Sequence, residues 1–182
     1  MTQSLHGTQA ASAWVERWAH LVPAGEPVLD VACGAGRHMR LFASRGHPVT
    51  GVDNSPEAIA AAAQAGDAVL ADIENGPWPF AGRTFGGVVV TNYLWRALFP
   101  VMVESVAPGG AMIYETFAAG NETVGKPSRP DFLLRDGELL SACAALRIVA
   151  YEDGFLDDPA RFVQRIAAVR RLAGNSRYPI RA

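Results

Sequence analysis

Two glycines and three aspartates carry the chemistry that this sequence suggests. Gly34 and Gly36 follow a short apolar run, where missing side chains let backbone amides approach a ligand closely. Asp30, Asp53 and Asp72 lie at or near the ends of three successive apolar runs. Asp53 follows Gly34 by 19 residues, close to the roughly 20 residues at which an acid meets a ribose diol in such units. The pattern predicts a nucleoside site.

Each of these signals also has a structural interpretation. A Gly-x-Gly pair alone fits a tight strand-to-helix turn that binds nothing. An aspartate that opens a loop, such as Asp72, often caps a turn, although its carboxylate could instead accept from an adenine amine. Asp53 is harder to explain in this way, because Ser55 already supplies the cap of the next helix.

The glycine pattern argues against a dinucleotide. Met39 stands where the third glycine of Gly-x-Gly-x-x-Gly would be. Asp30 would place a negative charge close to a pyrophosphate, whereas it favours a ligand with an ammonium or sulfonium group. A cationic nucleoside cofactor is therefore preferred, and a nicotinamide-dependent oxidoreductase remains the alternative.

Alternating strands and helices are expected to position these residues. The patterns predict helices near 14–21, 37–45, 55–66, 98–107 and 137–145, the last capped by Asp136, and strands near 28–33, 49–53, 68–71, 85–91, 111–117 and 147–151. Residues 162–169 fit a strand, but a helix over 159–172 is the alternative. The alternation predicts a doubly wound α/β sheet with helices on both faces, whose ligands bind beyond the carboxyl ends of the strands.

Length and charge limit the classes of function. The chain of 182 residues suits one domain, and its net charge of −2 does not predict a nucleic-acid or membrane partner. Arginines cluster near the end of the chain, which we interpret as a solvated face, with an RNA or acidic-partner patch as the alternative: Arg161, Arg165, Arg170, Arg171, Arg177 and Arg181. Two distant cysteines and the lack of a signal peptide favour the cytoplasm. Neither a metal-ligand spacing nor a Gly-x-Ser-x-Gly element occurs.

The segment from Val28 to Gly36 resembles the first motif of class I S-adenosylmethionine-dependent methyltransferases. Asp53, Asp72 and residues 108–110 fall where that family's later motifs lie, and the resemblance extends over about 14–170. It implies a Rossmann-like, mostly parallel seven-stranded sheet with the last strand antiparallel, which favours the strand at 162–169. It implies S-adenosylmethionine as cofactor, with contacts from Asp30, Ala32, Cys33, Gly34, Ala35, Gly36, Asp53, Asn54, Asp72, Ile73 and Thr91. The family often has glycine where this chain has Ala32.

Methyl transfer is an in-line displacement that mainly requires alignment of acceptor and methyl group. The expected catalytic candidates follow the fourth and fifth strands: Asn92, Tyr93, Tyr114 and Glu115. Tyr93, Trp95 and Phe117 are alternatively aromatic residues of the core or its rim. Arg37 and His38 open their helix and are expected on its surface, with a contact to the cofactor's carboxylate or to the acceptor as the alternative.

Residues 1–25 resemble the family's N-terminal flap, and 118–136 is expected to be an active-site loop. The chain lacks the Pro-Pro motif of methyltransferases that act on adenine or glutamine amino groups. A small-molecule acceptor is expected, and a non-catalytic nucleoside-binding module is a further alternative.

Overall fold

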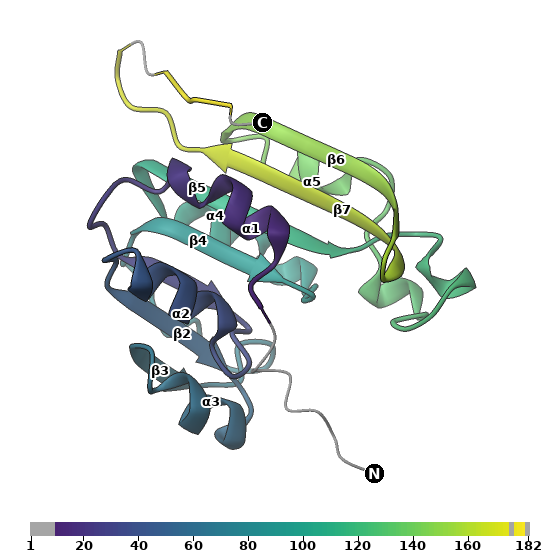
Figure 1. Ribbon diagram of the computed structural model, residues 1–182, viewed down its shortest axis with the longest axis horizontal. Coiled ribbons are helices and arrows are strands. Elements are labelled where there is room, and N and C mark those ends of the chain that lie inside the picture. Colours follow the sequence, from purple (N-terminus) through teal and green to yellow (C-terminus); the bar gives the residue numbers. More distant parts are fainter. Residues whose placement is uncertain (1–9, 175–176, 181–182) are drawn as a thin grey trace.

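The computed structural model describes residues 10–174 and 177–180, which form a seven-stranded sheet between two layers of helices (Figure 1). The strands are β1 (Val28–Val31), β2 (Val49–Asp53), β3 (Asp67–Leu70), β4 (Phe85–Thr91), β5 (Val106–Phe117), β6 (Arg147–Asp157) and β7 (Ala160–Val169). Their order across the sheet is β3-β2-β1-β4-β5-β7-β6.

Strands β1 to β5 pair in parallel, whereas β7 runs antiparallel to both β5 and β6. This arrangement confirms the predicted Rossmann-like sheet, and it excludes the helix over 159–172, because that stretch contains β7. The carboxyl ends of β1 to β5 meet at one edge of the sheet, where a ligand is expected in this architecture.

The two faces of the sheet are covered by different helices. Helices α1 (Ala13–Trp18), α2 (Arg37–Ser44) and α3 (Pro56–Ala62) pack on one face, and α4 (Phe99–Glu104) and α5 (Glu138–Ala142) pack on the other. Short 3₁₀ turns complete the order: η1 (Ala19–Leu21), η2 (Arg96–Leu98), η3 (Asn121–Thr123) and η4 (Pro130–Phe132). None of the helices in the described ranges has the length and apolar character needed to cross a membrane.

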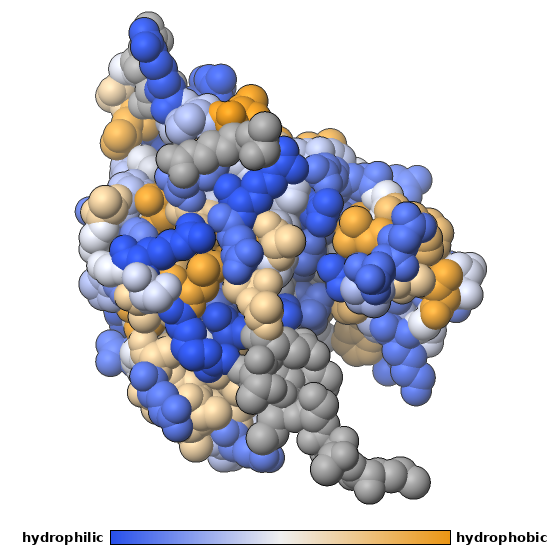
Figure 2. Space-filling model, in the orientation of Figure 1, coloured by the Kyte–Doolittle hydropathy of each residue, from blue (hydrophilic) through white to orange (hydrophobic). Residues whose placement is uncertain are grey.

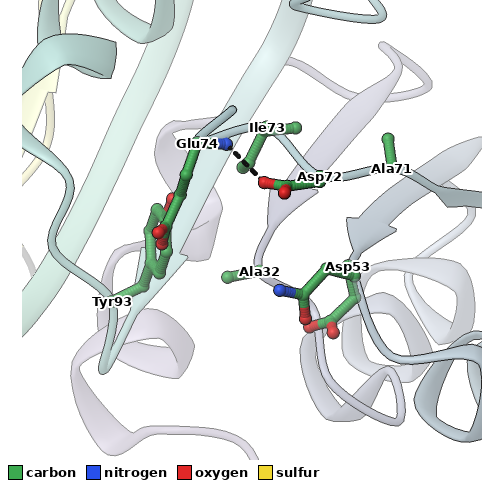
Figure 3. A pocket seen from close by; sticks show the side chains of 8 residues that line it. Ala32, Asp53, Ala71, Asp72, Ile73, Glu74 and Tyr93 are labelled. Atoms are coloured by element: carbon green, nitrogen blue, oxygen red, sulfur yellow. Dashed lines mark hydrogen bonds between the residues drawn. The ribbon is translucent and has the colours of Figure 1, made fainter. Parts of the chain in front are cut away.

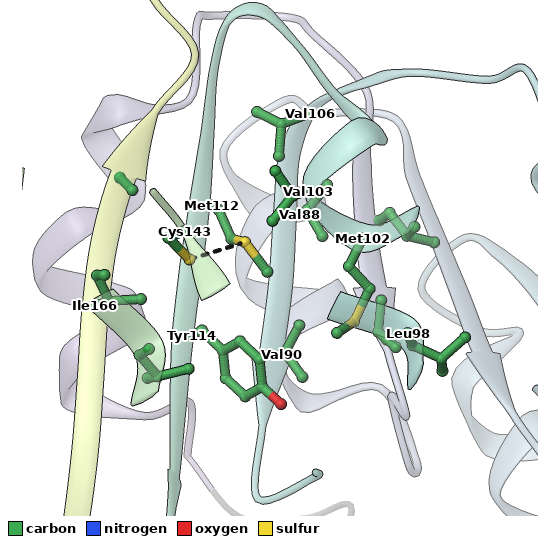
Figure 4. Close-up of a cluster of buried hydrophobic side chains, with 14 of the residues drawn as sticks. Val88, Val90, Leu98, Met102, Val103, Val106, Met112, Tyr114, Cys143 and Ile166 are labelled. Atoms are coloured by element: carbon green, nitrogen blue, oxygen red, sulfur yellow. Dashed lines mark hydrogen bonds between the residues drawn. The ribbon is translucent and has the colours of Figure 1, made fainter. Parts of the chain in front are cut away.

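Central strands of the sheet are buried on both faces, as their continuous apolar sequences predict. Val88 and Val90 of β4 lie against Met102 of α4, Tyr114 of β5 and Ile166 of β7 (Figure 4). Every residue of β4 is buried, so removal of apolar surface from water holds the centre of the sheet rigid. The adjoining carboxyl-terminal loops therefore start from fixed positions.

Several expected boundaries differ from the structure. Residues 108–110 lie inside β5, which begins at Val106, and the preceding helix is shorter than expected. Asp136 does not cap α5; Gly137 occupies the N-cap position in a left-handed conformation, without a side-chain hydrogen bond. Ser55 does cap α3, accepting from the amide of Ala58 at 3.2 Å. Ser12 caps α1 in the same way, accepting from the amide of Trp14 at 3.2 Å.

Candidate cofactor and acceptor site

A cavity of about 280 Å³ lies at the carboxyl ends of β1 to β4 (Figure 3). It is lined by Ala32, Asp53, Asn54, Ala71, Asp72, Ile73, Glu74 and Tyr93. Five of these residues were predicted as cofactor contacts and Tyr93 as an acceptor-side residue, whereas Ala71 and Glu74 were missed. Ala71 precedes Asp72 and Glu74 follows Ile73, so adjacency to these predicted residues is the sequence signal that could have found both.

The glycine loop forms the turn from β1 into α2 beside this cavity. Ala32, Gly34 and Gly36 all have positive φ angles, of 53°, 52° and 80°. This conformation disfavours side chains, which accounts for the family's glycine at the position of Ala32. A Cβ atom on Gly36 would lie 3.1 Å from Cα of Ala62, whereas a Cβ on Gly34 would meet nothing within 4 Å. The absence of a side chain at Gly36 allows the start of α2 to pack against α3, whereas the absence of one at Gly34 leaves open space.

Asp53 connects the loop to the second strand. Its Oδ2 accepts from the Gly34 amide at 2.9 Å, and its Oδ1 accepts from the Ser55 amide at 3.0 Å. A carboxylate offers about four acceptor positions, so each oxygen retains capacity for another donor. The side chain is thus fixed in orientation and still able to accept two hydroxyl groups of a ligand in the cavity.

Asp72 serves a turn as well as bordering the cavity. Its carboxylate accepts from the amides of Glu74 and Asn75 and from the Asn75 side chain. These bonds, first of all the one from the Asn75 side chain, lower the pKa of Asp72. The turn-capping interpretation is therefore confirmed, and the ionised Oδ2 atom still has room for a further donor.

Asp30 does not face the cavity, contrary to expectation. Its side chain is 2% exposed beneath the loop, and its Oδ2 atom has no hydrogen-bond partner among the described residues. Burial raises its pKa to about 7, an effect opposed by the charge of Arg37 and reinforced by that of Asp53. Asp30 therefore lies beneath the loop and is not among the residues that line the cavity.

His38 was expected on the surface, and this prediction is also wrong, because α1 and the segment before it cover that side of α2. His38 is 1% exposed, and burial lowers its pKa to about 3. Its Nε2 atom accepts from the Ser12 amide at 3.1 Å, so the proton of the neutral ring is on Nδ1, 4.0 Å from Oδ2 of Asp30.

The acceptor-side candidates divide into two groups. Tyr93 lines the cavity, and its hydroxyl oxygen is buried without a hydrogen-bond partner in the described ranges. Burial, followed by the charge of Glu74, raises the pKa of Tyr93 far above its ordinary value. Asn92 is exposed with a φ of 54°. Tyr114 is fully buried and donates to the Tyr93 carbonyl at 2.7 Å, so its role is structural.

Glu115 lies in a buried network on the face covered by α1. Its Oε1 accepts from the Ser12 hydroxyl at 2.9 Å, and its Oε2 accepts from Arg165 at 3.3 Å. Arg161 approaches the same carboxylate at 4.0 Å. The carboxylate is 3% exposed and surrounded by donors, so it is neither free to act as a base nor within the cavity.

The arginine-rich end of the chain is not one solvated face, contrary to the prediction. Arg165 pairs with Glu115 and Glu152, and Arg170 donates to the carbonyls of Val103 and Val106. Both side chains are therefore part of the fold, because β7 lies inside the sheet. Arg171 is exposed as expected, and Arg181 falls outside the described residues.

The remaining predicted cofactor residues lie around the cavity without lining it. Cys33, Gly34, Ala35 and Gly36 form the turn, and Thr91 ends β4, where its hydroxyl accepts from Arg37 at 3.2 Å. Residues 118–136 contain η3 and η4 and a bridge between Ala118 and Leu134. In the described ranges no cluster of three or more histidine, cysteine, aspartate or glutamate side chains could hold a metal ion.

Comparisons with known proteins agree with this geometry. A model of the methyltransferase domain family matches residues 28–110, which carry the glycine loop, Asp53 and Asp72. Malonyl-[acyl-carrier protein] O-methyltransferase of Serratia marcescens is 31% identical over 140 residues, covering 68% of this chain and 54% of that protein. The 18S rRNA (guanine-N(7))-methyltransferase of Schizosaccharomyces pombe is 38% identical over 80 residues, 41% of this chain and 30% of that one. The chain spans about half or less of these relatives.

Solved structures share the fold. TehB of Haemophilus influenzae superposes with a TM-score of 0.70 at 21% identity, over 93% of this chain and 64% of TehB. An S-adenosylmethionine-dependent methyltransferase of Mesorhizobium loti superposes with a TM-score of 0.67 at 17% identity, over 87% of this chain and 98% of that one. Motif, sheet order and relatives agree, and the chain belongs to the family of class I S-adenosylmethionine-dependent methyltransferases.

Proposed function

We propose that the protein transfers the methyl group of S-adenosylmethionine to a small-molecule acceptor. The observation that carries this proposal is the position of Asp53, whose carboxylate is oriented by Gly34 and Ser55 and faces a cavity at the ends of β1 to β4. A nicotinamide cofactor fits less well, because Met39 replaces the third glycine of the dinucleotide pattern.

The residues present fit a nucleoside with a donor-rich edge. Asp53 would accept the ribose hydroxyls, and Asp72 with Ile73 would hold the adenine, since the lowered pKa of Asp72 keeps it an acceptor. The amides of residues 33–36 would hold the methionine portion. The cavity is close to the lower end of the roughly 300–1,000 Å³ of ligand pockets, so it suits the nucleoside, with the remainder extending over the loop.

The acceptor would lie next to Tyr93. The bound cofactor supplies a methyl group on a sulfonium, and the protein aligns the acceptor with it. The raised pKa of Tyr93 keeps its hydroxyl protonated at neutral pH, so this residue would orient the acceptor as a hydrogen-bond donor and not remove its proton. An acceptor that is already ionised or soft needs no base. Both cysteines are free thiols, and we place the reaction in the cytoplasm.

Calorimetric titration with S-adenosylmethionine and S-adenosylhomocysteine, with NADH as the control ligand, tests this proposal. We expect both adenosyl ligands to bind and NADH not to bind. Absence of binding by both up to about millimolar concentration would overturn the proposal, since cofactors of enzymes bind more tightly. Incubation of cell extracts with methyl-labelled cofactor then distinguishes the enzyme, which gives a labelled product, from a module that only binds the nucleoside.

A further inference from the structure

The segment that follows β4 brings Tyr93 into the cavity (Figure 3). Its backbone is held from the side of β5. The Asn92 amide donates to the Glu115 carbonyl at 3.0 Å, and the Tyr114 hydroxyl donates to the Tyr93 carbonyl at 2.7 Å. The Tyr93 hydroxyl itself has no hydrogen-bond partner among the described residues. The direction of this side chain therefore depends on the packing of its ring and on the backbone on either side of it.

Arg96 holds the same segment from the other side. It lies at the start of η2, and its guanidinium donates to both carboxylate oxygens of Glu138, at 2.6 and 2.9 Å. It also donates to the carbonyls of Asp131 and Leu133, each at 2.8 Å. Paired hydrogen bonds between an arginine and a carboxylate fix direction as well as distance. The side chains of Arg96 and Glu138 are only 31% and 17% exposed, so water competes weakly for these bonds.

The charges of this pair are stable. Burial opposes the ionisation of Glu138, but hydrogen bonds from Arg96 and from the Arg135 amide outweigh it and lower the pKa of Glu138. The pKa of Arg96 is raised, first of all by its hydrogen bond to Glu138. Arginine also suits three separate acceptor groups, because its donors form a planar fork, whereas a lysine ammonium is a single point of charge.

Residues 131–138, which Arg96 contacts, are themselves attached to the sheet. Gln164 of β7 is fully buried, donates to the Arg135 carbonyl at 2.6 Å and accepts from the Leu139 amide at 3.2 Å. The Leu134 amide donates to the carbonyl of the last residue of β5 at 2.9 Å. Residues 131–138 are thus a fixed support, and Arg96 connects the segment after β4 to it.

This support belongs to a projecting part of the molecule. Residues 118–136 and the tip of the β6–β7 hairpin extend beyond the rest of the sheet (Figure 1). Figure 2 shows a recess between this projecting part and the remainder of the same face. A projecting part can shift relative to the sheet unless specific contacts hold it, and the four hydrogen bonds of Arg96 are such contacts. Arg96 does not line the cavity.

We propose that Arg96 is a positioning residue of the methyl transfer, which clamps the segment after β4 to residues 131–138 and thereby holds Tyr93 in the cavity. This inference rests on the proposed function, in which Tyr93 orients the acceptor. A displacement of about 1 Å in such a group can lower a rate by roughly 100-fold. The alternative is that Arg96 only stabilises the loop and has no effect on Tyr93.

The pKa of Tyr93 in the free protein separates these two roles. The chain has four tyrosines, and nuclear magnetic resonance of protein with Cζ-labelled tyrosine follows each, with Tyr93 assigned by its loss in Tyr93→Phe. In Arg96→Gln we expect the pKa of Tyr93 to fall by about one unit or more towards its ordinary value, because the displaced ring gains contact with water. Loss of the arginine charge alone would instead raise this pKa, since a cation favours the phenolate. The sign therefore distinguishes displacement from a direct effect of charge.

Three further measurements accompany this titration. Arg96→Lys keeps the charge but not the planar fork, and should restore the pKa of Tyr93 only in part. Arg83→Gln is the matched control, because Arg83 stacks over Phe80 and Phe85 at the opposite end of β4, and it should leave this pKa unchanged. Arg96→Gln should bind S-adenosylhomocysteine within about threefold of wild type. Its formation of labelled product in cell extracts, at saturating cofactor, should fall by about tenfold or more.

Other outcomes overturn a defined statement. If Arg96→Gln keeps the other tyrosine signals of the folded protein and the pKa of Tyr93 is unchanged or higher, the positioning role is wrong. If Arg96→Gln does not fold, Arg96→Lys decides, and a wild-type pKa of Tyr93 there would overturn the proposal. A lower pKa with unchanged product formation would remove both Tyr93 and Arg96 from the methyl transfer. If the wild-type protein does not bind S-adenosylhomocysteine, the proposed function fails, whereas the titration of the free protein still tests the clamp.

Discussion

The hydroxyl of Ser12 donates to Glu115 at 2.9 Å, across 103 residues of sequence, while the Ser12 backbone amide donates to His38. The same hydroxyl accepts from the amide of Trp14 and so caps α1. Ser12 thereby joins the first helix to β5 through its side chain and to α2 through its backbone amide, at the carboxyl edge of the sheet. The position of α1 over the acceptor side depends on these contacts.

Ser12→Ala should lower the free energy of unfolding by roughly 1–2 kcal/mol, because it removes an N-cap and leaves a buried carboxylate oxygen with one donor fewer. Urea denaturation measures the change. Ser44→Ala is the control, since its exposed hydroxyl contacts only the Leu41 carbonyl. Equal losses in the two variants would show that the contact with Glu115 contributes nothing.

Asp53→Asn should weaken binding of S-adenosylhomocysteine by roughly 10- to 100-fold, because an amide accepts fewer hydrogen bonds than a carboxylate and carries no charge. Calorimetry measures the dissociation constant. Asp67→Asn, at the exposed start of β3, serves as the comparison and should bind normally. Unchanged affinity in Asp53→Asn would remove this residue from the cofactor site.

Gly34→Ala and Gly36→Ala should separate binding from stability. Both place alanine at a positive φ angle, which costs roughly 1–2 kcal/mol, but only the Cβ at position 36 also meets α3, at Ala62. We expect Gly36→Ala to be the less stable of the two variants. In Gly34→Ala, we expect the loss of affinity for S-adenosylhomocysteine to be large compared with the loss of stability. Thermal unfolding and calorimetry on both variants decide this, and the reverse order would contradict the open space at Gly34.

Asp30→Asn should stabilise the protein more at high pH than at low pH. The folded-state pKa of Asp30, about 7, lies above its ordinary value of 3.8, so the unfolded chain loses this proton first and the contribution of Asp30 to stability falls as pH rises from about 4 to about 7. His38, with a folded-state pKa of about 3 against an ordinary 6.5, contributes stability that is lost as pH falls through that range. The two effects oppose each other in the wild-type protein.

Removal of the Asp30 carboxyl leaves the His38 contribution alone. The stability of Asp30→Asn relative to wild type should therefore rise by roughly 1–2 kcal/mol between about pH 5.5 and about pH 8. Urea denaturation at the two pH values checks this difference, with Asp67→Asn as the exposed control. A difference that does not vary with pH would mean that Asp30 is not buried in the way the structure indicates.

Local patterns in the sequence were sufficient to predict the sheet and most of the residues that line the cavity. The valines of β4 predict a strand because a run without polar residues can only be buried, and Ser55 predicts the start of α3 because its side chain caps amides within the next turn. Asp53 follows from its spacing to Gly34, since one strand-helix-strand unit fixes the separation. These features depend on neighbours that are close in sequence.

Contacts between distant segments decided the rest. The sequence predicts His38 on the surface of an amphipathic helix, whereas the packing of α1 buries it. The sequence predicts Glu115 as a free acid at the end of a strand, whereas in the structure Ser12 and Arg165 donate hydrogen bonds to its carboxylate. The sequence predicts Arg161 as part of a charged tail, and only the position of β7 between β5 and β6 brings it beside Glu115. Burial and charge pairing depend on which surfaces meet in three dimensions, and no local sequence pattern records that.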